Sequence, residues 1–227
     1  MELVVVSNAA TLDRPIRSSR ISVSRRLVLM TVACTAVAVG VGNLGILGLH
    51  VWASSGASAP HEMAGTHNFR MVDDKVWRGS RPSTAGYKAL AKAGVTTIVD
   101  LRAEKNVSVP EGMLAARGVE IVRIPMRDGQ APTDQQVRSF LDAVRKAPGI
   151  VYVHCMAGVG RTGTMVAAYL VGMRDISPAA AWRHNLSVGP PSLEQMVFVS
   201  GIDEPNVFVT AISRVLDAPR RLLTYVK

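Results

Sequence analysis

The pattern of hydrophobic positions divides the chain into four parts. Residues 27–52, LVLMTVACTAVAVGVGNLGILGLHVW, contain no Lys, Arg, Asp or Glu. Because about 20 apolar residues suffice for a helix to cross the hydrocarbon core of a bilayer, this run predicts one N-terminal transmembrane helix. We therefore expect a basic, disordered arm (1–26), a membrane span (27–52), a flexible linker (53–62) and a folded domain (63–227).

Within the folded domain, short apolar runs alternate with helical stretches. Strands are expected at 95–101, 120–124 and 150–154, and the runs 69–72 and 75–78 around Asp73-Asp74 predict a hairpin. Ser83, Ser177 and the pair Thr133/Gln136 are typical of helix N-termini. Helices are therefore expected from Ser83 to before Gly94, up to Arg117, and over 133–146, 162–174, 178–186, 192–199 and 207–225.

The order of these elements predicts the fold class. Strands separated by helices imply right-handed crossovers, and these connect parallel strands within one sheet. We expect an α/β domain with a central, mostly parallel sheet flanked by helices, preceded by the single transmembrane helix.

The flanks of the apolar run predict its orientation. Five arginines precede it, at 14, 17, 20, 25 and 26, whereas no Lys or Arg follows until Arg70. The positive-inside rule then places the N-terminus in the cytoplasm and the folded domain outside it. A secreted protein is the alternative, since a signal peptide would be cleaved. Signal peptides usually have shorter apolar regions, about 7–15 residues, which favours a retained signal anchor.

The charge and the cysteines limit the chemistry. A net charge of +9 suits nucleic acid, an anionic membrane or anionic substrates, but no basic motif with interleaved aromatics accompanies it, so we expect no nucleic-acid partner. Of the two cysteines, Cys34 lies in the apolar run, which excludes a disulfide framework. The five histidines do not pair at metal-ligand spacing, so no metal is expected. Cys155 is left as a lone thiol.

Cys155 lies in the segment 154–163, HCMAGVGRTG, between a predicted strand and a predicted helix. Backbone N–H groups around such a turn, together with a helix N-terminus, form a cradle for anions. Gly158 and Gly160 allow the backbone to curl there. The helix terminus and Arg161 favour the thiolate form of Cys155, and the planar guanidinium of Arg161 suits two oxygens of an oxyanion. This pattern indicates phosphoryl transfer through a covalent intermediate.

His-Cys, five residues and Arg-Thr-Gly resemble the signature of the cysteine-dependent protein tyrosine and dual-specificity phosphatases. Three further segments resemble small bacterial members of the dual-specificity group: Trp77–Pro82 (WRGSRP), Val99–Arg102 (VDLR) and Gly189–Gln195 (GPPSLEQ). The resemblance covers about residues 67–200 and implies a phosphatase that needs no cofactor.

The resemblance also implies roles for single residues. Cys155 would be the nucleophile, Asp128 the general acid on a movable loop, with Asp134 as the runner-up, and Thr162 the hydroxyl that assists the leaving sulfur. Asp134 has a simpler interpretation as a charge at a helix N-terminus. His154 would hold the loop by hydrogen bonds. The phosphate would be bound by Met156, Ala157, Gly158, Val159, Gly160 and Arg161.

The residues between Cys155 and Arg161 also bear on the substrate. They include no Lys or Arg, which favours singly phosphorylated substrates, phosphotyrosine first and phosphoserine or phosphothreonine second, on a protein or peptide. A phosphoinositide phosphatase, a rhodanese-like sulfurtransferase and a non-catalytic phosphopeptide-binding module remain alternatives. The oligomeric state stays open.

Five other positions have interpretations of their own. Asp100 and Arg102 are expected to pair at a strand end. Arg78 and Arg81 either brace the cysteine segment or are surface charges. Gln195 is expected on a helix surface, with a water-positioning role as the alternative.

Overall fold

The computed structural model describes residues 25–55, 61–104 and 108–202. Residues 1–24 of the arm expected at 1–26, the linker residues 56–60 and the helix expected at 207–225 lie outside the described residues, whereas Arg25 and Arg26 of the expected arm are helical. Internal contacts divide the chain into two units, Met1–Ala38 and Val39–Lys227. The boundary falls within the first helix, which is therefore described apart from the α/β domain.

The first helix, α1 (Arg25–Ser54), has 30 residues. At a rise of about 1.5 Å per residue, such a helix is longer than the hydrocarbon core of a bilayer is thick. Within the described residues, α1 is the one helix long and apolar enough to cross a membrane. It extends two residues beyond the charge-free run at each end, so the expected linker begins as helix. A membrane anchor and a signal sequence both fit these features.

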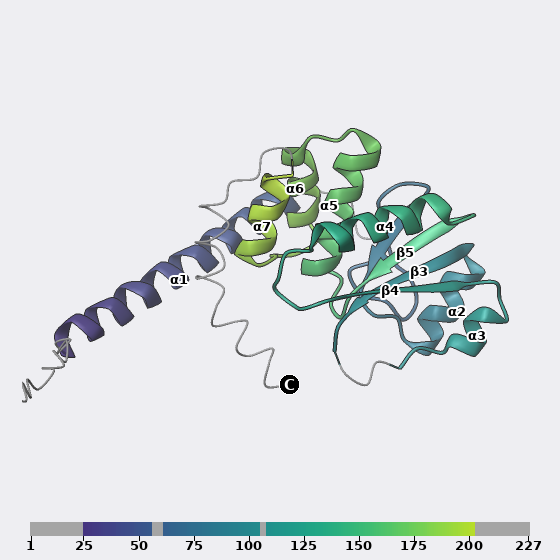
Figure 1. Cartoon of the computed structure of the whole chain (residues 1–227), viewed down its shortest axis with the longest axis horizontal. Helices are drawn as coiled ribbons and strands as arrows, with labels where there is room; N and C mark the ends of the chain where they lie inside the picture. Colours follow the sequence, from purple (N-terminus) through teal and green to yellow (C-terminus); the bar gives the residue numbers. More distant parts are fainter. Residues whose placement is uncertain (1–24, 56–60, 105–107, 203–227) are drawn as a thin grey trace, which may run out of the picture. The chain divides into compact units, whose positions relative to one another are not determined.

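The sheet of the α/β domain has five strands: β1 (Arg70–Met71), β2 (Val76–Gly79), β3 (Val95–Arg102), β4 (Glu120–Met126) and β5 (Ile150–His154). Their order is β1-β2-β5-β3-β4. The edge strand β1 runs antiparallel to β2, as the predicted hairpin requires, and the other pairs are parallel. The expected mostly parallel sheet is confirmed, and β5 lies at its centre (Figure 1).

The helices of the domain are α2 (Thr84–Lys92), α3 (Glu111–Ala115), α4 (Asp134–Lys146), α5 (Gly160–Arg174), α6 (Pro178–Leu186) and α7 (Leu193–Ser200). The caps expected at Ser83, Thr133 and Ser177 are confirmed, and Gln136 completes the capping box. Several boundaries differ from the predicted ones by one or two residues, and two of these differences lie near Cys155 or Asp128. β4 continues through Pro125 to Met126, and α5 starts at Gly160, two residues before Thr162.

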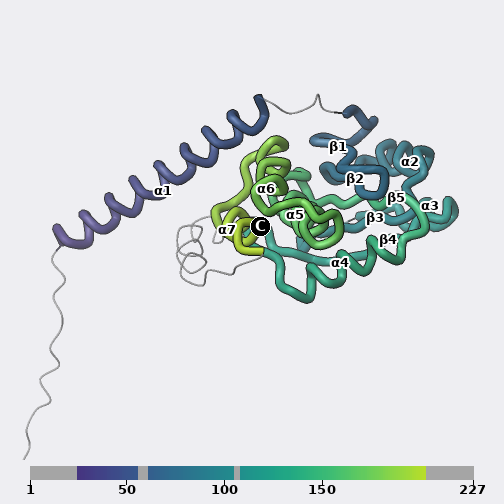
Figure 2. The backbone as a smooth tube through the Cα atoms, turned by 90° about the horizontal axis from the view of Figure 1, so that it is seen from above, coloured from purple at the N-terminus to yellow at the C-terminus, as the bar shows by residue number. Residues whose placement is uncertain are grey.

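The helices cover the sheet on both faces. Alternate residues of a strand point to opposite faces, and neighbours on β5 show this. Val151 and Val153 join the core beneath α4 and α5, whereas Tyr152 joins the core beneath α2 and α3. Figures 1 and 2 show α4 and α5 on one side of the sheet and α2 and α3 on the other. This double cover explains why β5 is apolar on both faces.

The four parallel strands end at one edge of the sheet. Gly79 and Asp100 both pair with His154, and Arg102 pairs with Met126. The segments that follow β2, β3, β4 and β5 therefore emerge side by side. Ligands of open α/β sheets bind beyond this carboxyl edge, and Cys155 follows β5 directly there.

His154, at the end of β5, is fully buried in the sheet. Its ring lies near those of Tyr152 and Tyr87, and its Nδ1 is 3.0 Å from the carbonyl oxygen of Cys155. Burial lowers the pKa of His154 from 6.5 to about 4, although Asp100 on β3 partly opposes this shift. The ring is therefore neutral at physiological pH, which fits a structural role.

This shift predicts acid-sensitive stability. The unfolded chain binds the imidazole proton below its ordinary pKa, whereas the folded chain binds it only below about pH 4. The free energy of unfolding should therefore fall as the pH drops from about 6.5 to 4, by about 3 kcal/mol from this group. Urea unfolding of the whole chain in a non-ionic detergent can measure this loss. A His154→Gln variant should lose less stability over the same range, and parallel pH profiles would contradict the assignment.

Candidate active site

The residues from Cys155 to Arg161, here called the cysteine loop, connect β5 to α5. Cys155 is buried at the start of this loop, and its Sγ accepts a hydrogen bond from the backbone N–H of Gly158 at 3.3 Å. The loop therefore curls around the sulfur, as the glycine pattern predicted.

The carbonyl groups of the cysteine loop point away from the sulfur. The Met156 carbonyl accepts from the backbone N–H of Arg81, and the Ala157 carbonyl from the side-chain amide of Asn68. The Gly158 carbonyl accepts from Nη2 of Arg78 at 2.8 Å. Because a trans peptide unit directs its C=O and N–H in opposite directions, the amides that follow these carbonyls face the side of the sulfur.

The N-terminus of α5 adds further donors to this cradle. Its N-cap, Val159, makes no side-chain capping bond. The first N–H groups of a helix have no intrahelical partner, and an uncapped end leaves them for a bound anion. The expected anion cradle is thus present in the backbone geometry.

Gly158 and Gly160 permit two close approaches. Gly158 has φ of +78°, and a Cβ there would overlap the backbone of Gly79 at the end of β2. A Cβ on Gly160 would overlap the side-chain amide of Gln195. Gly158 therefore needs glycine for its conformation and for its neighbour, and Gly160 leaves room for the side-chain amide of Gln195.

Arg78, on β2, is fully buried behind the cysteine loop. Its Nη2 donates to the carbonyls of both Gly158 and Val159. Burial lowers its pKa to about 10, partly offset by Cys155, so it stays charged at neutral pH. Of the two interpretations left open, the bracing role holds for Arg78. Arg81 has an exposed side chain and supports the loop only through its backbone N–H.

Arg161 is buried at the opposite end of the loop, and its guanidinium is held on two sides. Nη1 and Nη2 donate to the two carboxylate oxygens of Glu104 at 3.0 and 2.8 Å, and Nη1 also donates to the Met126 carbonyl. Burial opposes the charged form of Arg161, but the bonds to Glu104 outweigh it and raise its pKa. The guanidinium is therefore a charged group of fixed orientation.

Glu104 is a site residue that the sequence reading missed. It follows β3 by two residues, and bonding to Arg161 lowers its pKa despite the opposing effect of burial. The position of Glu104 in the sequence could have identified it, since polar residues just beyond the carboxyl end of a parallel strand lie at the edge of the sheet where ligands bind. Asn68, which orients the Ala157 carbonyl, offered no comparable signal.

The structure separates the two candidate acids. Asp128 follows β4, and its Oδ1 lies 3.2 Å from Nε of Arg161, with 58% of the side chain exposed. Asp134 is the exposed first residue of α4, where a negative charge suits the helix N-terminus. Of the two candidate acids, Asp128 is therefore the one that the fold brings to the cysteine loop.

Thr162 lies fully buried in the first turn of α5, next to Arg161. Its hydroxyl oxygen has no hydrogen-bond partner among the described residues. It therefore does not cap backbone donors in this structure, which leaves the hydroxyl available for another group.

Two expectations outside the loop have different outcomes. Asp100 and Arg102 form the expected pair, buried, at 2.8 Å. Gln195 was expected on a helix surface, and this is wrong, because its side chain is 1% exposed. It completes a capping box with Ser192 and lies against Gly160. A helix of eight residues whose first turn lies against two loops buries positions that an isolated helix would expose.

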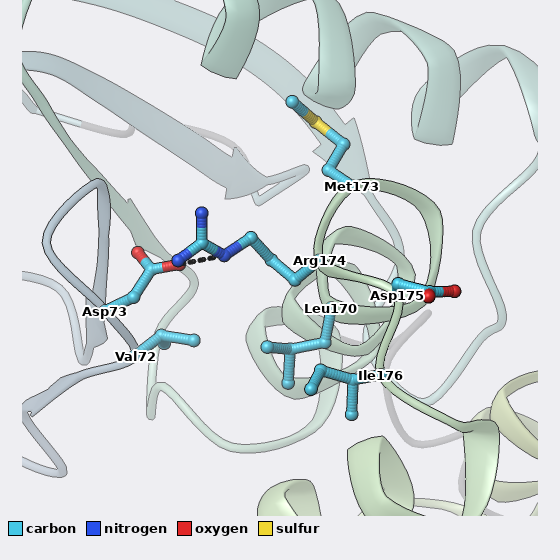
Figure 3. Close-up of a pocket in the computed structure, with 7 residues that line it drawn as sticks. All are labelled: Val72, Asp73, Leu170, Met173, Arg174, Asp175 and Ile176. Carbon is cyan, nitrogen blue, oxygen red and sulfur yellow. Dashed lines mark ion pairs between the residues drawn. The ribbon is translucent and has the colours of Figure 1, made fainter.

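A pocket of about 520 Å³ lies away from this site, at the C-terminal end of α5 (Figure 3). Its wall includes Asp73, which forms an ion pair with Arg174 at 3.0 Å. The cysteine loop adjoins the N-terminal end of the same helix. The pocket is therefore separate from the candidate active site.

Comparisons with known proteins agree with this geometry. The chain is 44% identical over 69 residues to dual specificity protein phosphatase CDC14C from Symphalangus syndactylus, which covers 28% of this chain and 14% of that protein. It is 30% identical over 123 residues to phosphatidylglycerophosphate phosphatase PTPMT2 from Arabidopsis thaliana, covering 52% of this chain and 54% of that protein. The chain thus spans about half, or less, of the length of these relatives.

Solved structures show the same fold. P. aeruginosa TpbA in complex with pTyr aligns with a TM-score of 0.50 and 20% identity, over 64% of this chain and 90% of that one. A family model described as "DSP-PTPase phosphatase fused to NAD+ Kinase" matches residues 58–201, more than half of the chain. The chain therefore belongs to this family of cysteine-dependent, dual-specificity and tyrosine-type phosphatases.

Proposed function

We propose that this chain hydrolyses phosphomonoesters through a phosphocysteine intermediate on Cys155. The observation that carries the proposal is the cysteine loop, whose amides face the sulfur while its carbonyls are bonded from outside. Such a cradle binds the non-bridging oxygens of a phosphoryl group and stabilises the charge of the transition state. Family membership supports the same reaction class.

In the first step, Sγ of Cys155 attacks phosphorus. The S–P bond forms as the bond from phosphorus to the ester oxygen breaks, and that oxygen takes the electron pair and a proton from Asp128. Glu104 holds Nη1 and Nη2 of Arg161, so phosphate oxygens would approach the edge formed by Nε and Nη2. Asp128 lies at Nε now, and phosphate would displace it towards the leaving oxygen.

In the second step, water attacks the phosphocysteine. Asp128, now a carboxylate, takes a proton from the water, the S–P bond breaks, and the thiolate returns. The unpartnered hydroxyl of Thr162 would donate to the sulfur as it leaves. Arg161 and the loop amides hold the phosphate in both steps.

Phosphotyrosine in a protein or peptide is the substrate that we favour. The residues exposed on the cysteine loop are Met156 and Ala157, which offer apolar contact and no second cation. The fold is shared with TpbA, whose structure holds pTyr. A lipid phosphomonoester is the second candidate, because PTPMT2 is named a phosphatidylglycerophosphate phosphatase and α1 could hold the domain at a bilayer.

Hydrolysis of p-nitrophenyl phosphate by the whole chain in detergent tests the reaction class. Turnover should persist with a metal chelator and be lost with vanadate or in Cys155→Ser. A phosphotyrosyl peptide and a short-chain phosphatidylglycerophosphate, compared at equal concentration, then separate the two substrate classes. A folded protein without turnover at any pH between 5 and 8 would contradict the proposal, since catalytic groups of this kind operate near neutrality.

Replacement of the general acid should slow the first step. In Asp128→Asn, we expect kcat/KM for phenyl phosphate to fall by about 10²–10⁴, the usual contribution of a positioned acid. Asp134→Asn is the matched control and should behave like the wild-type chain, because its carboxyl lies at the start of α4. A large loss in Asp134→Asn with normal turnover in Asp128→Asn would reverse the assignment.

We also propose that α1 is a retained anchor, with the N-terminus cytoplasmic and the α/β domain outside. The length of the helix supports its retention, and the arginines before the span support this orientation. In intact cells, a membrane-impermeant maleimide should label Ser58→Cys in a background that carries both Cys34→Ser and Cys155→Ser, and in the same background it should label Ser7→Cys only after permeabilisation. The reverse pattern would invert the topology, and release of the labelled domain into the medium would support signal cleavage.

A further inference from the structure

The segment that carries Asp128 is bonded to the N-terminal turn of α7 at three successive residues. We call residues 127–131 the Asp128 loop. Ser192 Oγ donates to the Gly129 carbonyl at 2.7 Å, and Gln195 Nε2 donates to the Gln130 carbonyl at 3.2 Å. The backbone N–H of Ala131 donates to Oε1 of Glu194 at 3.1 Å.

The three side chains at the start of α7 that make these hydrogen bonds are buried, so the bonds are shielded from water. Ser192, Glu194 and Gln195 are between 1% and 5% exposed. A carboxylate so far from water is costly unless it accepts hydrogen bonds, and Glu194 accepts one from the Asp128 loop. Its place in the first turn of α7 also suits a negative charge.

The same turn of α7 contacts the cysteine loop. Gly160 lies so close to the side-chain amide of Gln195 that a Cβ there would overlap it. Gln195 therefore touches both loops, the cysteine loop at Gly160 and the Asp128 loop at Gln130. The turn of α7 sets the spacing between the loop that holds the nucleophile and the loop that holds the acid.

We propose that Glu194 is a positioning residue for Asp128. By holding the Ala131 amide, it fixes the Asp128 loop so that the carboxyl group can reach the leaving oxygen. The inference rests on the proposed function, and it assigns to Glu194 an effect on proton transfer alone, with none on phosphate binding. Misplacement of a catalytic group by about 1 Å can cost about 10²-fold in rate, so a buried hydrogen bond at this position matters.

The dependence of the rate on the leaving group provides the test. Phenyl phosphate has a poor leaving group and needs the acid, whereas p-nitrophenyl phosphate has a good one and needs it less. In Glu194→Ala, we expect kcat/KM to fall about tenfold for phenyl phosphate and by much less for p-nitrophenyl phosphate. Inhibition by vanadate, which binds the cysteine loop, should be unchanged. Glu194→Gln keeps an oxygen acceptor and should recover most of the loss.

A double-mutant cycle shows whether Glu194 acts through Asp128. With Asp128→Asn already present, Glu194→Ala should cause no further loss, because the group that it positions is gone. Ser200→Ala is the control for α7, since its exposed hydroxyl bonds only its own helix in the described structure. If Glu194→Ala does not fold, Glu194→Asp, which shortens the side chain away from the Ala131 amide, serves the same cycle.

The outcomes separate this inference from the proposed function. An equal loss with both esters, or a full additional loss in the Asp128→Asn background, would overturn the role of Glu194 while leaving the phosphatase activity in place. A wild-type chain that hydrolyses neither ester would overturn the proposed function and this inference with it. The role of Glu194 would be established by a loss in Glu194→Ala that is larger for phenyl phosphate than for p-nitrophenyl phosphate and that is absent in the Asp128→Asn background.

Discussion

The candidate site depends on the hydrogen bonds that hold the carbonyl groups of the cysteine loop from outside. Arg78 supplies the main ones, from a fully buried guanidinium that reaches the carbonyls of Gly158 and Val159. A hydrogen bond to a charged group contributes about 1.5–3 kcal/mol, which offsets part of the cost of burying this charge. Because the carbonyls are fixed outward, the amides are fixed inward, and the loop is ready for an anion before one arrives.

The charged side chains are arranged around the cysteine loop in the same way as these hydrogen bonds. Arg78 lies behind the loop and Arg161 at its end, and both are buried and positively charged. Glu104 and Asp128 contact Arg161 from the loops after β3 and β4, and His154 beneath Cys155 is neutral. The sheet edge thus surrounds the sulfur with donors and cations, and its carboxylates contact Arg161. These donors and cations suit a bound phosphate dianion.

Much of the architecture followed from local sequence signals. Strand β5 was visible as an apolar run, and the caps at Ser83, Thr133 and Ser177 fixed the starts of α2, α4 and α6. Cys155 and Arg161 were placed together by their spacing in the segment after a predicted buried strand, and Asp128 was assigned through the resemblance to the phosphatases. The sequence signals for these predictions lie within a few residues of each position, or in the rule that ligands bind beyond the carboxyl ends of parallel strands.

Contacts between distant segments could not be predicted in this way. Asn68 reaches Ala157 across 89 positions, and Glu104 reaches Arg161 across 57. Gln195 was expected to be exposed because α7 alone would expose it, yet two loops cover its first turn. Such pairings depend on tertiary packing, and neither the periodicity nor the spacing of residues within one element encodes them.

The most direct test of the account is detection of the covalent intermediate. The whole chain would be mixed with excess phosphotyrosyl peptide, denatured within milliseconds at neutral pH, digested and analysed by mass spectrometry. The account predicts one phosphoryl group on the peptide that contains Cys155. In Asp128→Asn supplied with p-nitrophenyl phosphate, whose good leaving group does not need the acid, the second step is slow, and a larger fraction of this peptide should carry phosphate. Turnover without any phosphorylated Cys155 peptide, in the wild-type chain and in that variant, would contradict it.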